Sequence, residues 1–78
     1  MSRRKPGARE ELLHLTINGE DRSFDNVADV AALVRVLGLD PRKVAIERNL
    51  EIVPRSTYAQ VRVADGDRLE IVQFVGGG

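Results

Sequence analysis

The sequence contains no cysteine and a single histidine, His14. Without thiols the chain cannot form disulfides, use a cysteine nucleophile, or bind zinc or an iron–sulfur cluster through cysteine. One histidine is also too few for a metal site built from several histidines. No hydrophobic run approaches the roughly 20 residues that span a bilayer, and none follows the basic N-terminus as in a secretory signal. We therefore expect a soluble cytoplasmic protein with no metal site and no membrane partner.

The chain is also short. Its 78 residues allow one domain with one core, and a domain of this size buries only about 60% of the surface that the unfolded chain exposes. This argues against a self-contained enzyme with a large cleft. The sequence motifs of phosphate-binding loops, dinucleotide-binding folds, zinc proteases and serine hydrolases are all missing. We therefore predict no catalytic residue in this chain.

The net charge of zero conceals an asymmetry. Residues 1–10 carry a charge of +3, and residues 11–78 carry −3. Because the first ten residues lack hydrophobic periodicity and contain Pro6 and Gly7, we predict a disordered basic arm. Four basic residues with no aromatic residue among them are weak grounds for nucleic-acid binding. We favour a solubilising extension, and predict no nucleic-acid partner.

The first structured segment is predicted to be a β-hairpin. Leu13, Leu15 and Ile17 alternate with His14 and Thr16, which is the period of a strand with one buried face. Asn18-Gly19 follows, and this pair favours a tight hairpin turn because both residues tolerate positive φ. A return strand should run through Phe24. His14 lies on the polar face without a carboxylate or nucleophile placed for it, so we interpret it as a solvated residue.

A helix is predicted next, with Asn26 as N-cap and Asp29 in the first turn. Hydrophobic residues recur at helical spacing over about three turns; they are Val27, Val30, Leu33, Val34 and Leu37. Gly38 suits the left-handed position after a helix, and Pro41 prevents continuation.

Three further extended segments are predicted, over 44–48, 51–53 and 68–74, the second ended by Pro54. Residues 55–62 read as an irregular loop with Tyr58 and Val61 packed beneath it. Asp65-Gly66-Asp67 reads as a tight turn, which its two carboxylates stabilise rather than forming an acid–base pair. The order β-β-α-β-(β)-β with one helix predicts an α+β fold, a mixed sheet of four to five strands with the helix on one face.

Two features of the C-terminal part favour interaction with other proteins. If Leu69 and Ile71 point inward, Val72 and Phe74 point outward from the uncovered face, where they predict a docking patch. The alternative is that the segment 49–62 covers them. Arg55 could bind an anion or a partner, although an ordinary surface arginine is the simpler interpretation.

The second feature is the chain end. Gly76, Gly77 and Gly78 directly follow the last predicted strand. Glycines have high conformational entropy and no side chain to bury, so they add little to the stability of a fold. Without Cβ atoms they can lie extended in a narrow channel of another protein and place the terminal carboxylate there. We interpret them as a flexible tail made for insertion.

Through these segments and the glycine ending, the sequence resembles the small sulfur-carrier family of thiamine biosynthesis (ThiS), within the ubiquitin-like β-grasp fold. The resemblance covers residues 12–78 and rests on Asn18-Gly19-Glu20, on the stretch Asn49-Leu50-Glu51-Ile52-Val53-Pro54-Arg55-Ser56, on the Asp65-Gly66-Asp67 turn and on the ending Val75-Gly76-Gly77-Gly78. Together with the predicted basic arm at 1–10, which lies outside the resemblance, this divides the chain into three parts: the arm, a β-grasp domain at 11–74 and a Gly-rich tail at 75–78.

The resemblance implies a protein co-substrate rather than an enzyme. An E1-like adenylating enzyme would use ATP and Mg²⁺ to activate the Gly78 carboxylate, and a persulfide donor would convert it to a thiocarboxylate. Thiazole synthase would accept the sulfur. Gly76 and Gly77 would thread the partners' active sites, with Val72, Phe74 and Arg55 docking the body. No cofactor or metal is expected on this chain.

Other functions stay open at this point. The sulfur could serve another pathway, as in the molybdopterin synthase small subunit or in cysteine synthesis. The chain could instead be a ubiquitin-like protein modifier, with Lys5 and Lys43 as its only lysines. It could also be a plain β-grasp interaction module with an inert tail. The sequence leaves the accepting pathway, the oligomeric state and the role of residues 1–10 undetermined.

Overall fold

The computed structural model describes residues 12–75, so the predictions for the arm at 1–10 and for the glycines at 76–78 lie outside the described residues. Five strands and one α-helix make up the fold. They are β1 (Leu13–Ile17), β2 (Glu20–Phe24), α1 (Val30–Val36), β3 (Val44–Arg48), β4 (Glu51–Val53) and β5 (Arg68–Gln73), with short 3-10 turns η2 (Pro41–Lys43) and η3 (Arg55–Thr57).

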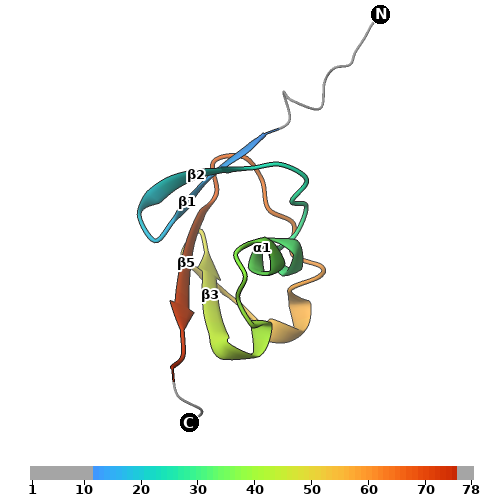
Figure 1. The fold of residues 1–78 in the computed structure, drawn as a ribbon, viewed down its shortest axis with the longest axis vertical. Helices are drawn as coiled ribbons and strands as arrows, with labels where there is room; N and C mark the ends of the chain where they lie inside the picture. The colour runs from blue at the N-terminus through green and yellow to red at the C-terminus, as the bar shows by residue number, and fades with distance from the viewer. Residues whose placement is uncertain (1–11, 76–78) are drawn as a thin grey trace, which may run out of the picture.

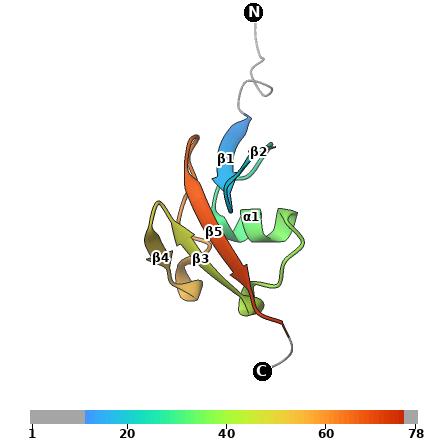
Figure 2. The ribbon, with the colours of Figure 1, turned by 90° about the vertical axis from the view of Figure 1, so that its left-hand side faces the viewer.

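The strands form one mixed sheet in the order β2-β1-β5-β3-β4. The last strand of the sequence, β5, is the central strand of the sheet. It runs parallel to β1 on one side and antiparallel to β3 on the other (Figure 2). The predicted α+β architecture with a mixed sheet and one helix is confirmed.

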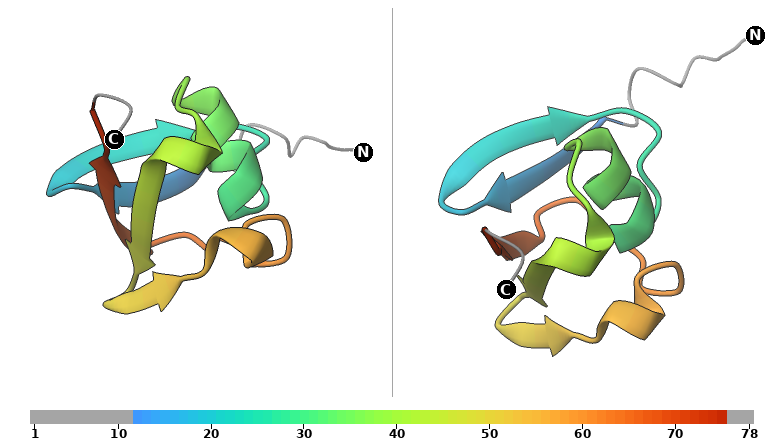
Figure 3. Two further views of the ribbon diagram at one scale, coloured as in Figure 1. Left: turned by 90° about the horizontal axis from the view of Figure 1, so that it is seen from below. Right: turned by 60° about the horizontal axis from the view of Figure 1, so that its bottom comes forward.

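Helix α1 covers one face of this sheet, and within residues 12–75 no helix lies over the opposite face (Figures 1 and 3). The core lies between the two layers and is lined by alternate strand residues and by one side of the helix. Its most deeply buried large side chains are Leu15, Val30, Leu33, Val34, Val44 and Leu69. The alternation predicted for the first and last strands is therefore confirmed at Leu15, Ile17, Leu69 and Ile71, which are buried, while the predicted inward residue Leu13 is only partly buried.

The predicted first hairpin is confirmed. β1 pairs with β2 from Leu13 opposite Phe24 to Ile17 opposite Glu20. The two residues of the turn, Asn18 and Gly19, have φ of 52° and 84°. This left-handed geometry matches the right-handed twist of the strands, and Asn and Gly are the residues that adopt it at least cost.

The predicted start of the helix is wrong. Asn26 has a φ of 63°, whereas an N-cap residue has extended backbone geometry. Asp29 is extended and is the cap, and its Oδ1 accepts a hydrogen bond from the Ala32 N–H at 2.8 Å. Helix α1 is therefore only seven residues long, shorter than predicted. Val27 is buried, but it packs from the loop that precedes the helix.

The segment after β4 is more ordered than predicted. It forms the turn η3 and then lies against the start of α1, where the N–H groups of Val30 and Ala31 donate to the carbonyl oxygens of Val61 and Tyr58. Tyr58 is buried and Val61 partly so, as predicted. These bonds satisfy helix N–H groups that have no partner within the helix. The loop therefore closes one side of the core.

Candidate functional site

The candidate site is the C-terminal end of β5 together with the uncovered face of the sheet around it. Sequence reasoning placed Val72, Phe74 and the glycine tail here. Because β5 carries the tail, what holds this strand in place also decides where the tail begins.

Asn18 fixes β5 from the side of β1. Its backbone N–H donates to the Leu69 carbonyl at 2.9 Å. Its side-chain amide donates to the Ile71 carbonyl at 3.1 Å and accepts from the Ile71 N–H at 2.7 Å. The Asn18 side chain thus forms the two hydrogen bonds to Ile71 that a further residue of β1 would otherwise form. It extends the short parallel pairing of β1 with β5, in which the last pair of opposite residues is Ile17 and Leu69.

Asn49 fixes the start of β5 from the side of β3. Its N–H donates to the Arg68 carbonyl at 2.7 Å, and its Oδ1 accepts from the Arg68 N–H at 2.9 Å. The Nδ2 of the same side chain donates to Asp67 Oδ1 at 3.0 Å. Two asparagine side chains therefore hold β5 on its opposite edges.

Asp67 is the one buried charged side chain among the described residues, with 7% of its surface exposed. Its Oδ2 accepts from Arg48 Nε at 2.7 Å and from the Ala64 N–H at 2.8 Å. Burial opposes the charged form, but the hydrogen bonds from Asn49, Ala64 and Arg48 outweigh it and lower the pKa of Asp67.

The neighbouring carboxylate is structural too, because Asp65 Oδ1 accepts from the His14 N–H at 2.7 Å.

These contacts agree with the interpretation of the Asp65-Gly66-Asp67 turn as stabilised by its carboxylates. Gly66 has a φ of 90°, a conformation that suits glycine. The His14 side chain is exposed, and its Nδ1 lies 3.2 Å from Ser23 Oγ. No carboxylate oxygen is hydrogen-bonded to this ring in the described part of the chain. The solvated interpretation of His14 is consistent with this position.

The far end of β5 leaves the sheet abruptly. Just past the end of β5, the Phe74 N–H donates to the carbonyl of Lys43, the last residue of η2, at 2.8 Å. Val75, the next residue, has 92% of its surface exposed. Strand β5 itself ends at Gln73, one residue before the predicted end. The tail therefore begins next to η2, at the edge of the domain (Figure 1).

Val72 and Phe74 are exposed as predicted. The exposed fractions are 58% for Val72 and 50% for Phe74, so the segment 49–62 leaves both accessible. Ile52 on β4, which was not among the predicted docking residues, is 77% exposed. Its partner in the sheet register is Glu47, on the uncovered face. The inward position of Val53 could have indicated that Ile52 points outward, but a strand of three residues is too short to show a clear alternation.

A groove of about 550 Å³ lies on this face of β5, β3 and β4. Ala45, Ile52, Pro54 and Val72 supply hydrophobic walls and floor, while Glu47 and Glu70 lie at one side. The groove combines a hydrophobic surface with charged groups, as is common where proteins bind one another transiently. We call the groove and its lining the outer-face groove.

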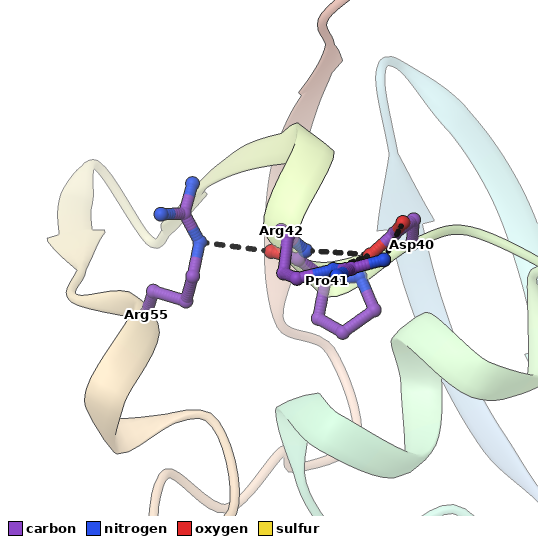
Figure 4. Close-up of polar contacts among 4 residues, drawn as sticks. All are labelled: Asp40, Pro41, Arg42 and Arg55. Atoms are coloured by element: carbon purple, nitrogen blue, oxygen red, sulfur yellow. Dashed lines mark hydrogen bonds and ion pairs between the residues drawn. The ribbon is translucent and has the colours of Figure 1, made fainter.

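Arg55 lies at the border of this groove but already has structural contacts. Its Nε donates to the Pro41 carbonyl at 2.9 Å (Figure 4). Its Nη2 donates to the Val44 carbonyl at 3.3 Å. These bonds tie η3 to η2 and to the first residue of β3. At the N-cap of η2, hydrogen bonds and charge from Arg42 lower the pKa of Asp40 to about 2. The predicted docking role of Arg55 stays a prediction.

A scan against protein-family models matches residues 15–78 to the ThiS family. The chain belongs to the ThiS family of sulfur carrier proteins. It is 37% identical over 65 residues to the sulfur carrier protein ThiS of Bacillus subtilis, a match that covers 82% of this chain and 98% of that protein. It also matches the crystal structure of a thiamine biosynthesis protein (ThiS) from Geobacter metallireducens, with a TM-score of 0.72, 32% identity, and coverage of 85% and 100% of the two chains.

A second kind of relative is larger. A thiazole synthase of Paramagnetospirillum magneticum is 64% identical over 66 residues, which are 85% of this chain but only 20% of that protein. A thiazole synthase of Magnetococcus marinus is 38% identical, with the same coverage. This ThiS-family chain thus spans about a fifth of the length of these two relatives.

Residues 12–75 contain no group of three or more His, Cys, Asp or Glu side chains able to hold a metal ion. In the same residues, no helix is both long enough and hydrophobic enough to cross a membrane.

Proposed function

We propose that this chain carries sulfur for the thiazole part of thiamine biosynthesis, as a thiocarboxylate on Gly78. The observation that supports this most directly is the construction of β5. The strand is held by Asn18 and Asn49 and ends at Gln73, and three glycines follow two residues later in the sequence. A well-anchored strand followed by residues without Cβ atoms suits delivery of a chain end into a narrow site.

The chemistry explains why a carboxylate at the chain end needs a partner. A free carboxylate is a poor electrophile. An adenylating enzyme would transfer AMP from MgATP to the Gly78 carboxylate and release pyrophosphate. A donor persulfide would then attack the acyl carbon and expel AMP, and a second thiol would reduce the resulting acyl disulfide. The products are the Gly78 thiocarboxylate and a disulfide on the donor side.

The remaining partners follow from the same proposal. We assign ATP and Mg²⁺ to the adenylating enzyme, and we expect thiazole synthase to accept the sulfur in the cytoplasm. Gly76 and Gly77 would occupy the partners' channels. Val72 and Phe74 would dock the body, with Arg55 at the border of the same face. Thiazole synthases that contain a region similar to this chain support this assignment of the acceptor.

Intact mass spectrometry tests the proposal. The chain is incubated with ATP, Mg²⁺, a persulfide donor and the adenylating enzyme of the same organism. We expect a mass gain equal to exchange of one oxygen for sulfur, located by fragmentation at Gly78. An unchanged mass, with an enzyme that modifies another carrier, would contradict the proposal.

A truncation separates the tail from the fold. Deleting Gly78 should abolish sulfur loading, while the urea unfolding transition stays unchanged because the described core ends before the tail. Loading of the truncated chain would exclude the terminal carboxylate as the carrier group. Loading of the full chain with transfer to molybdopterin synthase, and none to thiazole synthase, would place it in the alternative pathway.

A further inference from the structure

Asn18 and Gly19, the pair that closes the first hairpin, can also react with each other. The backbone nitrogen of a residue that follows asparagine can attack the side-chain amide carbon and expel ammonia. The product is a cyclic succinimide, which water opens to an aspartate or to an isoaspartyl linkage. Glycine after asparagine favours this deamidation, because no Cβ atom crowds the attacking nitrogen.

The Gly19 nitrogen is accessible for this attack. Within residues 12–75, its N–H donates no hydrogen bond. A Cβ atom placed on Gly19 would meet no atom beyond its chain neighbours within 4 Å, so this side of the turn is open. Asn18 and Gly19 are both exposed. The attacking nitrogen, the water and a path for the departing ammonia are therefore all available.

The Asn18 amide, in contrast, is held by β5. Its Oδ1 accepts from the Ile71 N–H at 2.7 Å, and its Nδ2 donates to the Ile71 carbonyl at 3.1 Å. Ring closure turns the amide toward the Gly19 nitrogen and removes Nδ2 as ammonia. The reaction therefore cannot proceed with both bonds intact, and this end of the pairing between β1 and β5 must open first.

The other two asparagines separate the two requirements. The Asn49 amide is also held at the start of β5, by bonds of 2.9 and 3.0 Å, but Leu50 follows it and its Cβ crowds the attacking nitrogen. The Asn26 side chain forms no hydrogen bond within residues 12–75, and the β-branched Val27 follows it. Of the three, Asn18 alone precedes a glycine.

We propose that Asn18 is a deamidation site whose reactivity is controlled by the hold on β5. The amide resists the reaction while it bonds to Ile71, and it reacts with the Gly19 nitrogen when this end of β5 opens.

The product weakens the same hold. An aspartate at position 18 lacks the N–H that the Ile71 carbonyl accepts and places a carboxylate oxygen against that carbonyl. An isoaspartyl linkage also lengthens the backbone of the turn by one carbon. Because neither change reverses spontaneously to the amide, each reacted chain keeps a less firmly held β5, the strand that leads to the tail.

Tryptic peptide mapping tests the site. Trypsin places the three asparagines in three different peptides. The cleavage sites that separate them are Arg22, Arg35, Arg48 and Arg55. The full chain is kept in a mildly alkaline buffer, with and without denaturing urea, and the mass change from amide to acid is followed in each peptide. In urea we expect Asn18 to react faster than Asn26 and Asn49. In the folded chain the Asn18 rate should fall about tenfold or more, because opening breaks two hydrogen bonds.

Two variants test the role of the following residue. Leu50→Gly gives Asn49 a glycine neighbour, at a position whose φ of 72° suits glycine. We expect Asn49 in L50G to react in urea as fast as Asn18 and to become slower on folding, as Asn18 does. Gly19→Ala is measured in urea, where its effect on the fold does not matter, and should slow the reaction of Asn18.

The variant Asn18→Asp tests the effect of the product. Its matched control is Asn26→Asp, the same change at an exposed residue that also has positive φ. We expect the unfolding equilibrium constant of N18D to rise about tenfold in urea denaturation, because a partly buried carbonyl loses its donor. Amide hydrogen exchange over residues 69–74 should become faster. N26D should match the wild type in both measurements.

The outcomes leave the proposed function out of account, because no partner enzyme takes part. Equal Asn18 rates in the folded chain and in urea would overturn the control by β5. Equal rates at all three asparagines in urea would overturn the role of Gly19. If N18D unfolds and exchanges like the wild type, the product does not weaken the hold on β5. A failure of sulfur loading would contradict the proposed function and leave this inference standing.

Discussion

All three asparagines of the sequence have a left-handed backbone, with φ of 52° at Asn18, 63° at Asn26 and 51° at Asn49. Asparagine is one of the few residues with a side chain that adopt this conformation readily. At Asn18 and Asn49 the turn also directs the amide toward β5, where it bonds to backbone groups. The same residue therefore closes a hairpin and anchors the strand that carries the tail.

Replacing Asn18 by glycine separates these two roles. Glycine keeps the positive φ but lacks the amide that bonds to both backbone groups of Ile71. We expect N18G to lower the free energy of unfolding by about 1–3 kcal/mol, because a partly buried N–H and C=O lose their partner. Urea denaturation measures this. A loss no larger than about 0.5 kcal/mol, the scale of an ordinary surface substitution, would show that the turn alone matters.

The ion pair between Arg48 and Asp67 ties the end of β3 to the turn before β5. We expect Arg48→Ala to lower the free energy of unfolding at pH 7 by about 1–3 kcal/mol, since Asp67 keeps its charge while losing a charge-assisted bond. Arg48→Lys should recover part of this loss, because it restores the charge without the planar guanidinium.

The pH dependence of this pair has a definite sign. The folded state lowers the pKa of Asp67 from its ordinary value of 3.8. The stabilisation is therefore present in full above about pH 3.8 and is lost as the pH falls through the lower folded value. The free energy of unfolding should therefore differ less between wild type and R48A as the pH falls through this range, which urea denaturation curves at a series of pH values can measure. A constant difference would contradict the assignment.

At the scale of elements, the helix shows why its start was predicted at the wrong residue. Asn26 and Asp29 are both good N-cap residues, and Val27 fits the hydrophobic stripe. The sequence pattern alone therefore allows either start. Packing decides between them, because Asp29 forms an isolated β-bridge with Arg62 and the loop end at Val61 bonds to the Val30 N–H. The helix can begin only after this bridge.

Substitution of Asp29 tests the observed cap. We expect Asp29→Ala to lower the free energy of unfolding by about 0.5–2 kcal/mol, because the Ala32 N–H loses its acceptor. Asp29→Ser keeps a capping oxygen and should restore most of the stability. Thermal or urea unfolding of the two variants gives the comparison. Equal losses for both would mean that the carboxylate acts through its charge rather than as a cap.

At the scale of the whole molecule, one helix on a five-stranded sheet leaves one sheet face uncovered. The covered face holds the core, and the uncovered face carries the exposed Val72, Phe74 and Ile52. Because β5 lies at the centre of the sheet, its outward residues are in the middle of that face and not at an edge. A partner that docks there lies next to the start of the tail.

The basic arm should be dispensable for this arrangement. We predict that a chain lacking residues 1–10 unfolds with the same free energy and is loaded with sulfur at the same rate as the full chain. The reason is that the core begins with the strand at Leu13. Urea denaturation and the loading assay above check both parts. A lower loading rate at unchanged stability would instead assign the arm a role in partner binding.

The sequence by itself determined the fold class, the hairpin turn at Asn18-Gly19, the inward and outward residues of β1 and β5, and the family. Each of these follows from local chemistry: side-chain alternation, residues that tolerate positive φ, or a run of motif residues. A local signal is complete within a few neighbouring positions, so it can be interpreted without knowing what lies across the sheet.

Only the tertiary structure decided which residues anchor β5, where the helix begins and how the outer-face groove is formed. Asn18 and Ile71 are 53 positions apart, and Ala45 and Val72 belong to different strands. Such contacts depend on strand order and register, which place β5 between β1 and β3. The sequence shows neither neighbour of β5, whereas the fold holds this strand from both sides through Asn18 and Asn49.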